Sequence, residues 1–268
     1  FYSHAFMTAS GWVVRVARTE DAADRHAMES RVLPLLAGRL PIAVPQPVRL
    51  LGTGPSTRYG AFGYRALAGR LMTERDAHGP GRSAFAASLA EGLAALHATP
   101  SEMVADVAME RLRPASFSRL RNSVLPELRK RLTASEWGRV TGWWDRFLAD
   151  PSLRNFEPVL THGDVWWENL LVDDGRVTGM IDWEWLSVGD AAWDLASAHQ
   201  MGDLFAGELW RAYAARRPLD PGAGRAEHRG AVHAGLPRRG LVPAPSDARG
   251  PARPSVGGRG RRGLRRDP

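Results

Sequence analysis

The chain of 268 residues contains no cysteine. It therefore has no disulfide framework, no thiolate nucleophile and no zinc site with cysteine ligands. It also has no apolar run of the roughly 18 residues that a membrane-spanning helix needs, and its first residues lack the basic and apolar segments of a signal peptide. We therefore expect a cytoplasmic protein with no membrane partner. Because the chain begins at Phe1 rather than Met, we also expect upstream residues to be missing.

Aromatic residues are absent after Tyr213, and the composition changes near that point. Residues 218–268 hold 11 arginines against 4 acidic residues, which accounts for the whole net charge of +7. Gly and Pro make up 18 of these residues. Such a segment buries too little apolar area to offset the entropy lost on ordering, so the composition predicts a disordered tail. An out-of-frame reading of a GC-rich gene would give the same bias, so a frameshift is a second explanation.

The positive net charge raises the question of whether the protein binds a nucleic acid. Residues 1–217 are neutral overall, so the body of the protein needs no polycationic surface. An RNA-binding protein acting through the arginine-rich tail is an alternative function, but we favour a solvated tail over it.

Residues 11–65 read as strands with one helix. Residues 11–18 and 59–65 have β-branched or aromatic strand patterns, and residues 41–52 are extended and interrupted by proline. Residues 25–36 have helical spacing, with Met28, Val32 and Leu35 on one side and Glu29 beside them.

Helices dominate after Gly69. Residues 82–98 place four apolar side chains on one face of a predicted helix: Phe85, Leu89, Leu93 and Leu96. A second helix is predicted to begin with a capping box of Thr133 and Glu136 and to end before Pro151. We expect it to bury Trp137, Val140, Trp144 and Phe147.

A β-hairpin is predicted around Asp174-Gly175, because strand-like residues lie on both sides of this dipeptide. A turn centred there would pair Asn169 with residue 180. Asn169 and Asp182 would then lie together at the open end of the hairpin, and Asp164 would lie on the loop that precedes it. Carboxylate and amide oxygens of this kind are ligands suited to Mg²⁺.

His162, Asp164 and Asn169 have the spacing of a kinase catalytic loop, H-x-D-x-x-x-x-N. Asp182 follows on the next strand in "IDW", where a metal-binding aspartate is expected. Together with "HGD" and the downstream "GDAAWDLA", this ordered set resembles the aminoglycoside phosphotransferase family, which includes macrolide kinases. The resemblance runs from about residue 11 to residue 211.

The resemblance implies an α+β, bilobal, protein-kinase-like fold with a small β-rich N-lobe and a larger, mainly helical C-lobe. It implies that Asp164 orients or deprotonates the attacking hydroxyl, and that Asn169 and Asp182 hold Mg²⁺. It further implies that His162 braces the loop by hydrogen bonding and that Asp194 anchors the loop backbone.

In the N-lobe, the resemblance places Arg15 where many relatives have a phosphate-binding lysine, with Glu29 as its partner. The only lysine of the chain, Lys130, lies far along the sequence. The segment that would meet the nucleotide base contains Tyr64, Arg65 and Leu67. The implied boundaries are residues 1–66 for the nucleotide-binding lobe, truncated at its start, and 67–217 for the catalytic and acceptor lobe. Residues 218–268 form the tail.

Two departures from the family pattern are expected. The strand and phosphate-covering loop that usually precede residue 12 would be largely absent. The helices that usually follow residue 211 would be replaced by the tail.

The implied function is transfer of the γ-phosphoryl group of ATP or GTP to a hydroxyl of a small molecule, such as an aminoglycoside or a macrolide. Three acids could attract a polycationic aminoglycoside: Glu168, Glu184 and Asp190. An apolar acceptor would suit the four tryptophans of the segment, which could equally be core: Trp166, Trp167, Trp183 and Trp185. A catalytically impaired, nucleotide-binding relative is the alternative, and the sequence leaves the oligomeric state open.

Overall fold

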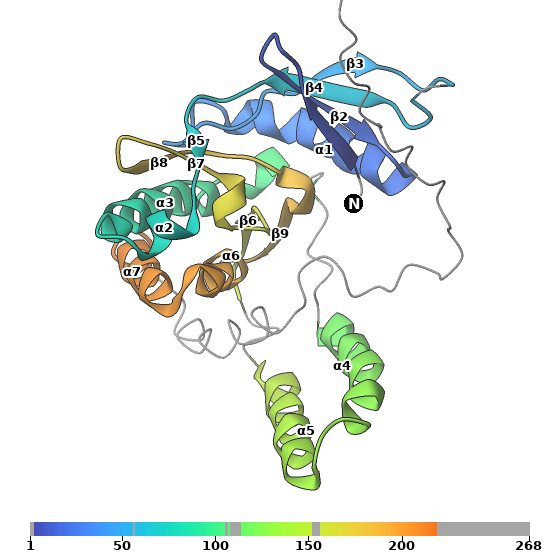
Figure 1. Cartoon of the computed structure of the whole chain (residues 1–268), viewed down its shortest axis with the longest axis vertical. Coiled ribbons are helices and arrows are strands. Elements are labelled where there is room, and N and C mark those ends of the chain that lie inside the picture. Colours follow the sequence, from blue (N-terminus) through green and yellow to red (C-terminus); the bar gives the residue numbers. More distant parts are fainter. Residues whose placement is uncertain (1–2, 56, 105–106, 108–113, 152–155, 219–268) are drawn as a thin grey trace, which may run out of the picture. The chain divides into compact units, whose positions relative to one another are not determined.

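The computed structural model describes residues 3–55, 57–104, 107, 114–151 and 156–218 (Figure 1). The predicted tail of residues 218–268 therefore lies outside the described residues, except for Pro218. Among the described residues, no helix is both long and apolar enough to cross a membrane.

The strands are β1 (Ser3–Met7), β2 (Trp12–Ala17), β3 (Val48–Leu51), β4 (Ala61–Arg65), β5 (Arg70–Leu71), β6 (Pro158–Thr161), β7 (Leu170–Asp173), β8 (Arg176–Met180) and β9 (Ser187–Asp190). The α-helices are α1 (Glu20–Leu36), α2 (Glu74–His78), α3 (Arg82–His97), α4 (Pro114–Arg129), α5 (Ala134–Ala149), α6 (Ala191–Ser197) and α7 (Asp203–Ala214). The short 3₁₀ helices are η1 (Ser101–Val104), η3 (Trp167–Asn169), η4 (Trp183–Trp185) and η5 (Ala198–Met201).

The N-terminal strands form an antiparallel sheet in the order β1-β2-β4-β3, and α1 lies beside it (Figure 1). Thr19 begins α1 by accepting a hydrogen bond from the backbone N–H of Ala22. His26 of α1 packs edge-on against Phe62 of β4, with 4.4 Å between the ring centroids. The strands and the helix predicted for residues 11–65 are therefore present.

Two details of this region differ from expectation. The expectation that the strand before residue 12 is largely absent is wrong, because β1 precedes that residue and pairs with β2 along its whole length. Of the three apolar residues expected on one side of the helix, Val32 is buried but Leu35 is exposed. The buried side of α1 instead includes Glu29, Leu33 and Leu36.

Helix α3 is the centre of the main hydrophobic core. Its four predicted core residues, Phe85, Leu89, Leu93 and Leu96, are all buried, as expected. Helix α7 packs along α3 and contributes Phe205, Leu209 and Tyr213 to the same core. The core therefore joins α3, which precedes the HGD motif of residues 162–164 in the sequence, to α7, which follows it.

Helices α4 and α5 contribute a second, smaller cluster around Phe117, Trp144 and Phe147. The predicted capping box is confirmed, since Thr133 and the Glu136 side chain bond each other's backbone N–H groups. Trp144 and Phe147 are buried as predicted, whereas Trp137 and Val140 are only half-buried.

Strands β7 and β8 form the predicted hairpin, with Asp174 and Gly175 both at positive φ in its turn. The predicted pairing of Asn169 with residue 180 is wrong by one position, because Met180 pairs with Leu170. A bulge between Leu171 and Val172 shifts the register. The open end still forms, since the N–H of Ile181 donates to the carbonyl of Asn169 at 2.9 Å.

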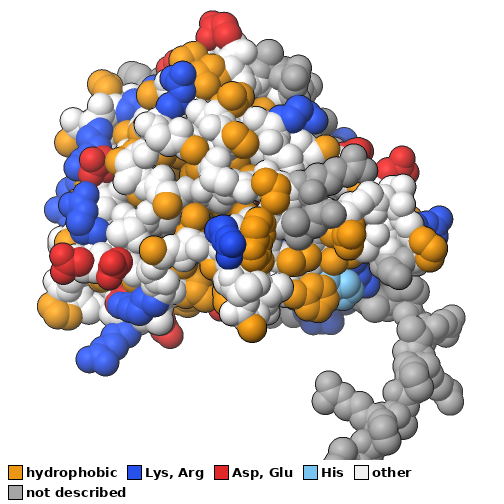
Figure 2. Space-filling view, turned by 90° about the horizontal axis from the view of Figure 1, so that it is seen from above, with side chains coloured by type: hydrophobic (Ala, Val, Ile, Leu, Met, Phe, Trp, Pro, Cys, Tyr) orange, Lys and Arg blue, Asp and Glu red, His pale blue; other side chains and the backbone are white. Residues whose placement is uncertain are grey.

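The N-terminal sheet exposes several large apolar side chains: Phe6, Met7, Val48 and Leu51. On the face seen in Figure 2, hydrophobic side chains are interrupted by Lys and Arg side chains and by other atoms.

Adjacent residues of α7 allow a direct test of the α3–α7 core. Phe205 is fully buried, whereas Leu204 is 69 % exposed. We expect Phe205→Ala to lower the free energy of unfolding by about 3 to 5 kcal/mol, because it removes buried apolar area and leaves a cavity. Leu204→Ala should change it by less than about 0.5 kcal/mol. Urea unfolding of both variants measures this, and equal losses would contradict the packing.

Candidate active site

The loop after β6 carries the HGD motif and is held by one buried carboxylate. Asp194 of α6 is inaccessible to solvent. Its Oδ2 accepts the backbone N–H of His162 at 2.8 Å, and its Oδ1 accepts that of Gly163 at 2.7 Å. The predicted anchoring of the loop backbone by Asp194 is therefore present in the structure.

Asp194 is in turn supported by His97, the last residue of α3. The Nε2 of His97 lies 3.1 Å from the Asp194 carboxylate, to which its N–H donates, and its Nδ1 is hydrogen-bonded to the hydroxyl of Tyr213 at 2.8 Å. Burial alone would raise the pKa of Asp194, but hydrogen bonds from His97 and from the backbone of Gly163 lower it. Asp194 is therefore a buried anion whose hydrogen bonds link α6 to α3 and to the loop after β6, and His97 extends this network to Tyr213 of α7.

His162 and Gly163 bring this loop against the segment after β8. His162 Nε2 donates to the carbonyl of Ile181 at 3.0 Å, and its Nδ1 accepts the N–H of Asp164 at 3.2 Å. Gly163 has φ of +84°, and a Cβ there would lie 2.5 Å from the carbonyl oxygen of Trp185. Only glycine fits this position, which gives a steric reason for the middle residue of HGD.

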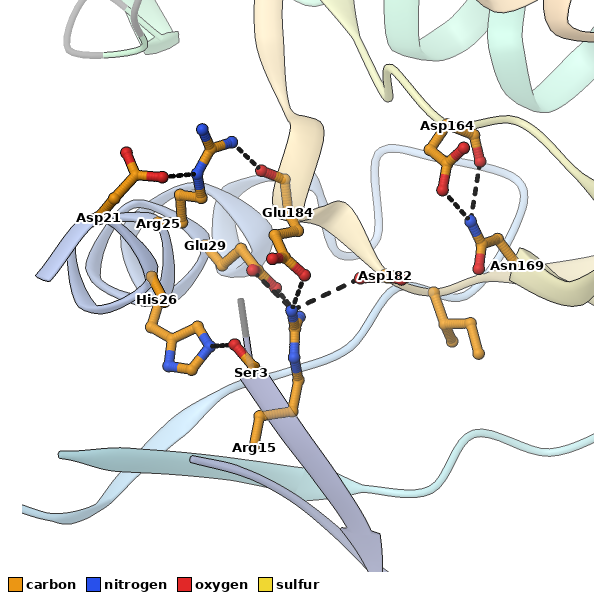
Figure 3. A network of polar contacts seen from close by, with 12 residues as sticks. Ser3, Arg15, Asp21, Arg25, His26, Glu29, Asp164, Asn169, Asp182 and Glu184 are labelled. Atoms are coloured by element: carbon orange, nitrogen blue, oxygen red, sulfur yellow. Dashed lines mark hydrogen bonds and ion pairs between the residues drawn. The ribbon is translucent and has the colours of Figure 1, made fainter. Parts of the chain in front are cut away.

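Asp164 and Asn169 are in direct contact. The Nδ2 of Asn169 donates to the carboxylate Oδ2 of Asp164 and to its carbonyl, both at 2.9 Å (Figure 3). This arrangement fixes the Asn169 amide, so that its Oδ1 is the atom available as a metal ligand.

Asp182 lies just after β8, in the left-handed region with φ of 62° and ψ of 62°. Such a conformation costs a non-glycine residue of order 1 to 3 kcal/mol and is concentrated at functional sites. The next residue, Trp183, is fully buried, and its indole N–H donates to the carbonyl of Met180 at 2.9 Å. Trp183 is therefore core and fixes the turn that carries Asp182.

Arg15 of β2 is the buried cation of the site (Figure 3). Its Nη1 donates to both carboxylate oxygens of Glu29 at 3.1 and 2.9 Å, which is the predicted partnership. Its Nη2 lies 3.5 Å from Asp182 and donates to Glu184 at 2.8 Å. The pKa of Glu29 is raised to about 7, chiefly by burial and also by the charges of Asp182 and Glu184, while Arg15 opposes the rise.

The three residues predicted to meet the nucleotide base differ in their surroundings. Tyr64 is buried, and burial raises its pKa to about 12. Arg65 is exposed and lies over the ring of Trp12, with its guanidinium 4.7 Å from the centroid. Leu67 is half-buried.

The structure thus forms two local sets from the predicted residues: Asp164 with Asn169, and Arg15 with Glu29 and Asp182. Sequence reasoning missed that Glu184 belongs to the second set, and the suggestion that it lines an acceptor site is wrong because it is buried against Arg15. It also missed the role of His97. In the sequence, Glu184 and His97 are each only an ionisable residue beside apolar residues, and no motif indicates their partners.

Magnesium can be assessed from the chemistry of the donor atoms. No group of three or more His, Cys, Asp or Glu residues could hold a metal ion within the part of the chain that the structure describes. Asp182 and the Oδ1 of Asn169 offer one carboxylate and one amide oxygen. That set fits Mg²⁺, which is usually held by one or two protein carboxylates together with waters and substrate phosphates.

Relatives were found both among sequences and among structures. The chain is 28% identical over 195 residues to the uncharacterized protein YcbJ of Bacillus subtilis, a match that covers 70% of this chain and 62% of YcbJ. The chain thus spans less than two thirds of that relative.

Solved structures of antibiotic phosphotransferases are similar over most of the chain. The GDP and kanamycin complex of APH(2″)-IIIa matches with a TM-score of 0.74 and 23% identity, over 87% of this chain and 79% of that one. Macrolide 2′-phosphotransferase MphH from Brachybacterium faecium matches with a TM-score of 0.61 and 26% identity, over 85% and 78%. The mixed α/β fold of this chain is therefore the fold of these kinase-like enzymes.

A family model gives the most direct assignment. It matches residues 5–230, a range that includes both local sets of residues. The chain belongs to the phosphotransferase enzyme family (APH).

Proposed function

We propose that this protein transfers the γ-phosphoryl group of ATP or GTP to a hydroxyl of a small antibiotic, of the aminoglycoside or macrolide type. The observation that carries the proposal is the fixed pair of Asp164 and Asn169 beside the end of β8, where Asp182 lies. A nucleotide donor accords with two of the similar structures, since APH(2″)-IIIa was solved with GDP and APH(2″)-Ib with ADP. ATP and GTP are cytoplasmic metabolites, so we place the reaction in the cytoplasm.

Asp164 is the proposed base. Its carboxylate accepts from Asn169, which holds it in one orientation. From there it accepts a hydrogen bond from the acceptor hydroxyl and takes its proton as the oxygen attacks phosphorus. The buried Asp194 keeps the loop backbone fixed, so Asp164 does not have to be ordered when the substrate binds.

Asn169 and Asp182 are the proposed magnesium ligands. When bound there, Mg²⁺ neutralises charge on the transferring phosphoryl group. Arg15 supplies a further positive charge next to Asp182, and Glu29 holds its guanidinium. We place the base of the nucleotide along Tyr64, Arg65 and Leu67, in a bilobal arrangement with residues 1–66 as the nucleotide-binding lobe and 67–217 as the catalytic and acceptor lobe.

The side chains near the motif favour a macrolide over an aminoglycoside. Of the three acids considered for a polycationic acceptor, Glu184 binds Arg15 and Asp190 caps α6. Trp166 and Trp167, by contrast, stack with centroids 3.9 Å apart and are only half-buried. An aromatic pair of this kind gives an apolar acceptor a surface on which to pack.

The proposal is tested with a panel of kanamycin, gentamicin, streptomycin and macrolides, with ATP and GTP as donors. We expect phosphorylated product from at least one macrolide, detected by mass spectrometry as a gain of one phosphoryl group. Product from aminoglycosides alone would contradict the preference for an apolar acceptor. Nucleotide binding without any product would indicate the catalytically impaired relative.

The base assignment is tested by Asp164→Asn. We expect turnover to fall by at least about 100-fold, because the amide cannot accept the hydroxyl proton. Mg·nucleotide affinity, measured by calorimetry, should stay within about threefold of the parent, because the variant keeps an oxygen that can accept from Asn169. Asp145→Asn is the control, since Asp145 is an exposed partner of Arg121. Turnover within about threefold of the parent would remove Asp164 from the mechanism.

The metal assignment is tested by Asp182→Asn. We expect the affinity for Mg·nucleotide to fall by at least about 30-fold, because only neutral oxygens would remain as ligands. Affinity for the nucleotide in EDTA should change much less. Titration calorimetry with and without Mg²⁺ separates the two effects, and an equal loss in both conditions would mean that Asp182 does not act through the metal.

A further inference from the structure

Glu184 is held by two arginines, yet none of the roles proposed above uses it. Its carboxylate is buried and accepts from Arg15 Nη2 at 2.8 Å. Its backbone carbonyl accepts from Arg25 Nη1 of α1 at 2.7 Å. One residue of η4 is thus bound by β2 through its side chain and by α1 through its backbone (Figure 3).

The guanidinium of Arg15 uses separate nitrogens for separate partners. Nη1 is directed to Glu29 of α1, and Nη2 is directed to Glu184 of η4. The planar guanidinium group of arginine can bind two carboxylates in this way, one through each terminal nitrogen. Lysine has only one side-chain nitrogen and cannot reproduce this arrangement. The arrangement therefore gives a physical reason for arginine at residue 15.

The contact with Glu184 also determines where Nη2 lies relative to Asp182. Glu184 is two residues after Asp182, and the Oδ1 of Asp182 is 3.5 Å from the same Nη2. The turn itself is fixed from the other side, because Gly163 packs directly on the backbone of Trp185. The turn that carries Glu184 is thus held by contacts other than the one with Arg15.

We propose that Glu184 is a positioning residue of the donor site, which holds Arg15 beside Asp182 before the nucleotide binds. This inference rests on the proposed function. A cation and a metal-binding carboxylate that are already in place need no reorganisation when the phosphates and Mg²⁺ arrive. Without Glu184, Arg15 would keep Glu29, but its Nη2 would retain only the longer contact with Asp182 and would have to be repositioned during binding.

The test is Glu184→Gln, which keeps the shape of the side chain and the backbone bond from Arg25 but removes the charge. We expect the dissociation constant for Mg·ATP or Mg·GTP to rise about tenfold, equivalent to about 1.4 kcal/mol. The turnover number at saturating nucleotide should stay within about threefold. Far-UV circular dichroism should match the parent.

A matched control is Glu91→Gln. Glu91 of α3 pairs with Arg176 of β8 at 3.1 Å, but both side chains are exposed. This variant removes the same charge from an arginine pair elsewhere in the fold. Its nucleotide affinity should equal that of the parent.

The decisive experiment compares Glu184→Gln in the parent protein and in the Arg15→Lys variant. If Glu184 acts through the guanidinium of Arg15, Glu184→Gln should weaken nucleotide binding about tenfold in the parent. In the Arg15→Lys variant the same substitution should weaken binding less than about twofold, because lysine already lacks the second nitrogen. The same factor in both backgrounds would overturn the proposal, because Glu184 would then act on the turn alone. Unchanged affinity in the parent background would also overturn it.

The outcome separates this inference from the proposed function. If the parent binds neither Mg·ATP nor Mg·GTP, the proposed function fails and the positioning role falls with it. If the parent binds nucleotide and Glu184→Gln binds it equally well, only the positioning role fails.

Discussion

The conformation of the HGD loop depends on one carboxylate that is inaccessible to solvent. Asp194 accepts two consecutive backbone N–H groups of the HGD loop and a third bond from His97. A buried anion is stable only when such bonds replace its lost hydration, and removing any one of them would leave a costly polar group behind. Because Asp194 lies on α6 and His97 ends α3, the conformation of the loop is tied to the packing of the core. The position of Asp164 therefore depends on these two helices and, through His97, on Tyr213 of α7.

Local signals in the sequence are sufficient for most of the elements. The periodicity of α3 indicates its buried face, the capping box indicates the start of α5, and Asp174-Gly175 indicates the hairpin. These features succeed because each depends on neighbours within a few residues. The predicted register of the hairpin is wrong because a bulge adds one residue to a strand, and composition does not reveal where a bulge falls.

The motif residues of the candidate site can be predicted from the sequence, but most of the residues that hydrogen-bond to them cannot. Asp164, Asn169 and Asp182 follow from spacing, and the pairing of Arg15 with Glu29 follows from resemblance to the family. The bond between Arg15 and Glu184 could not be predicted, because it joins segments that only the tertiary fold brings together. The position of His97 at the end of a leucine-rich helix favours a packed or capping role, and its bond to Asp194 shows that it also supports the loop.

The Arg15–Glu184 bond also has a consequence for how the protein is made. The two residues are 169 positions apart. At a synthesis rate of roughly 5 to 20 residues per second, Arg15 is translated about 8 to 34 seconds before Glu184. During that interval β2 and α1 can fold with Glu29 as the partner of Arg15, while the second carboxylate is still missing. The donor side of the protein is thus completed only late in translation, when the turn after β8 emerges.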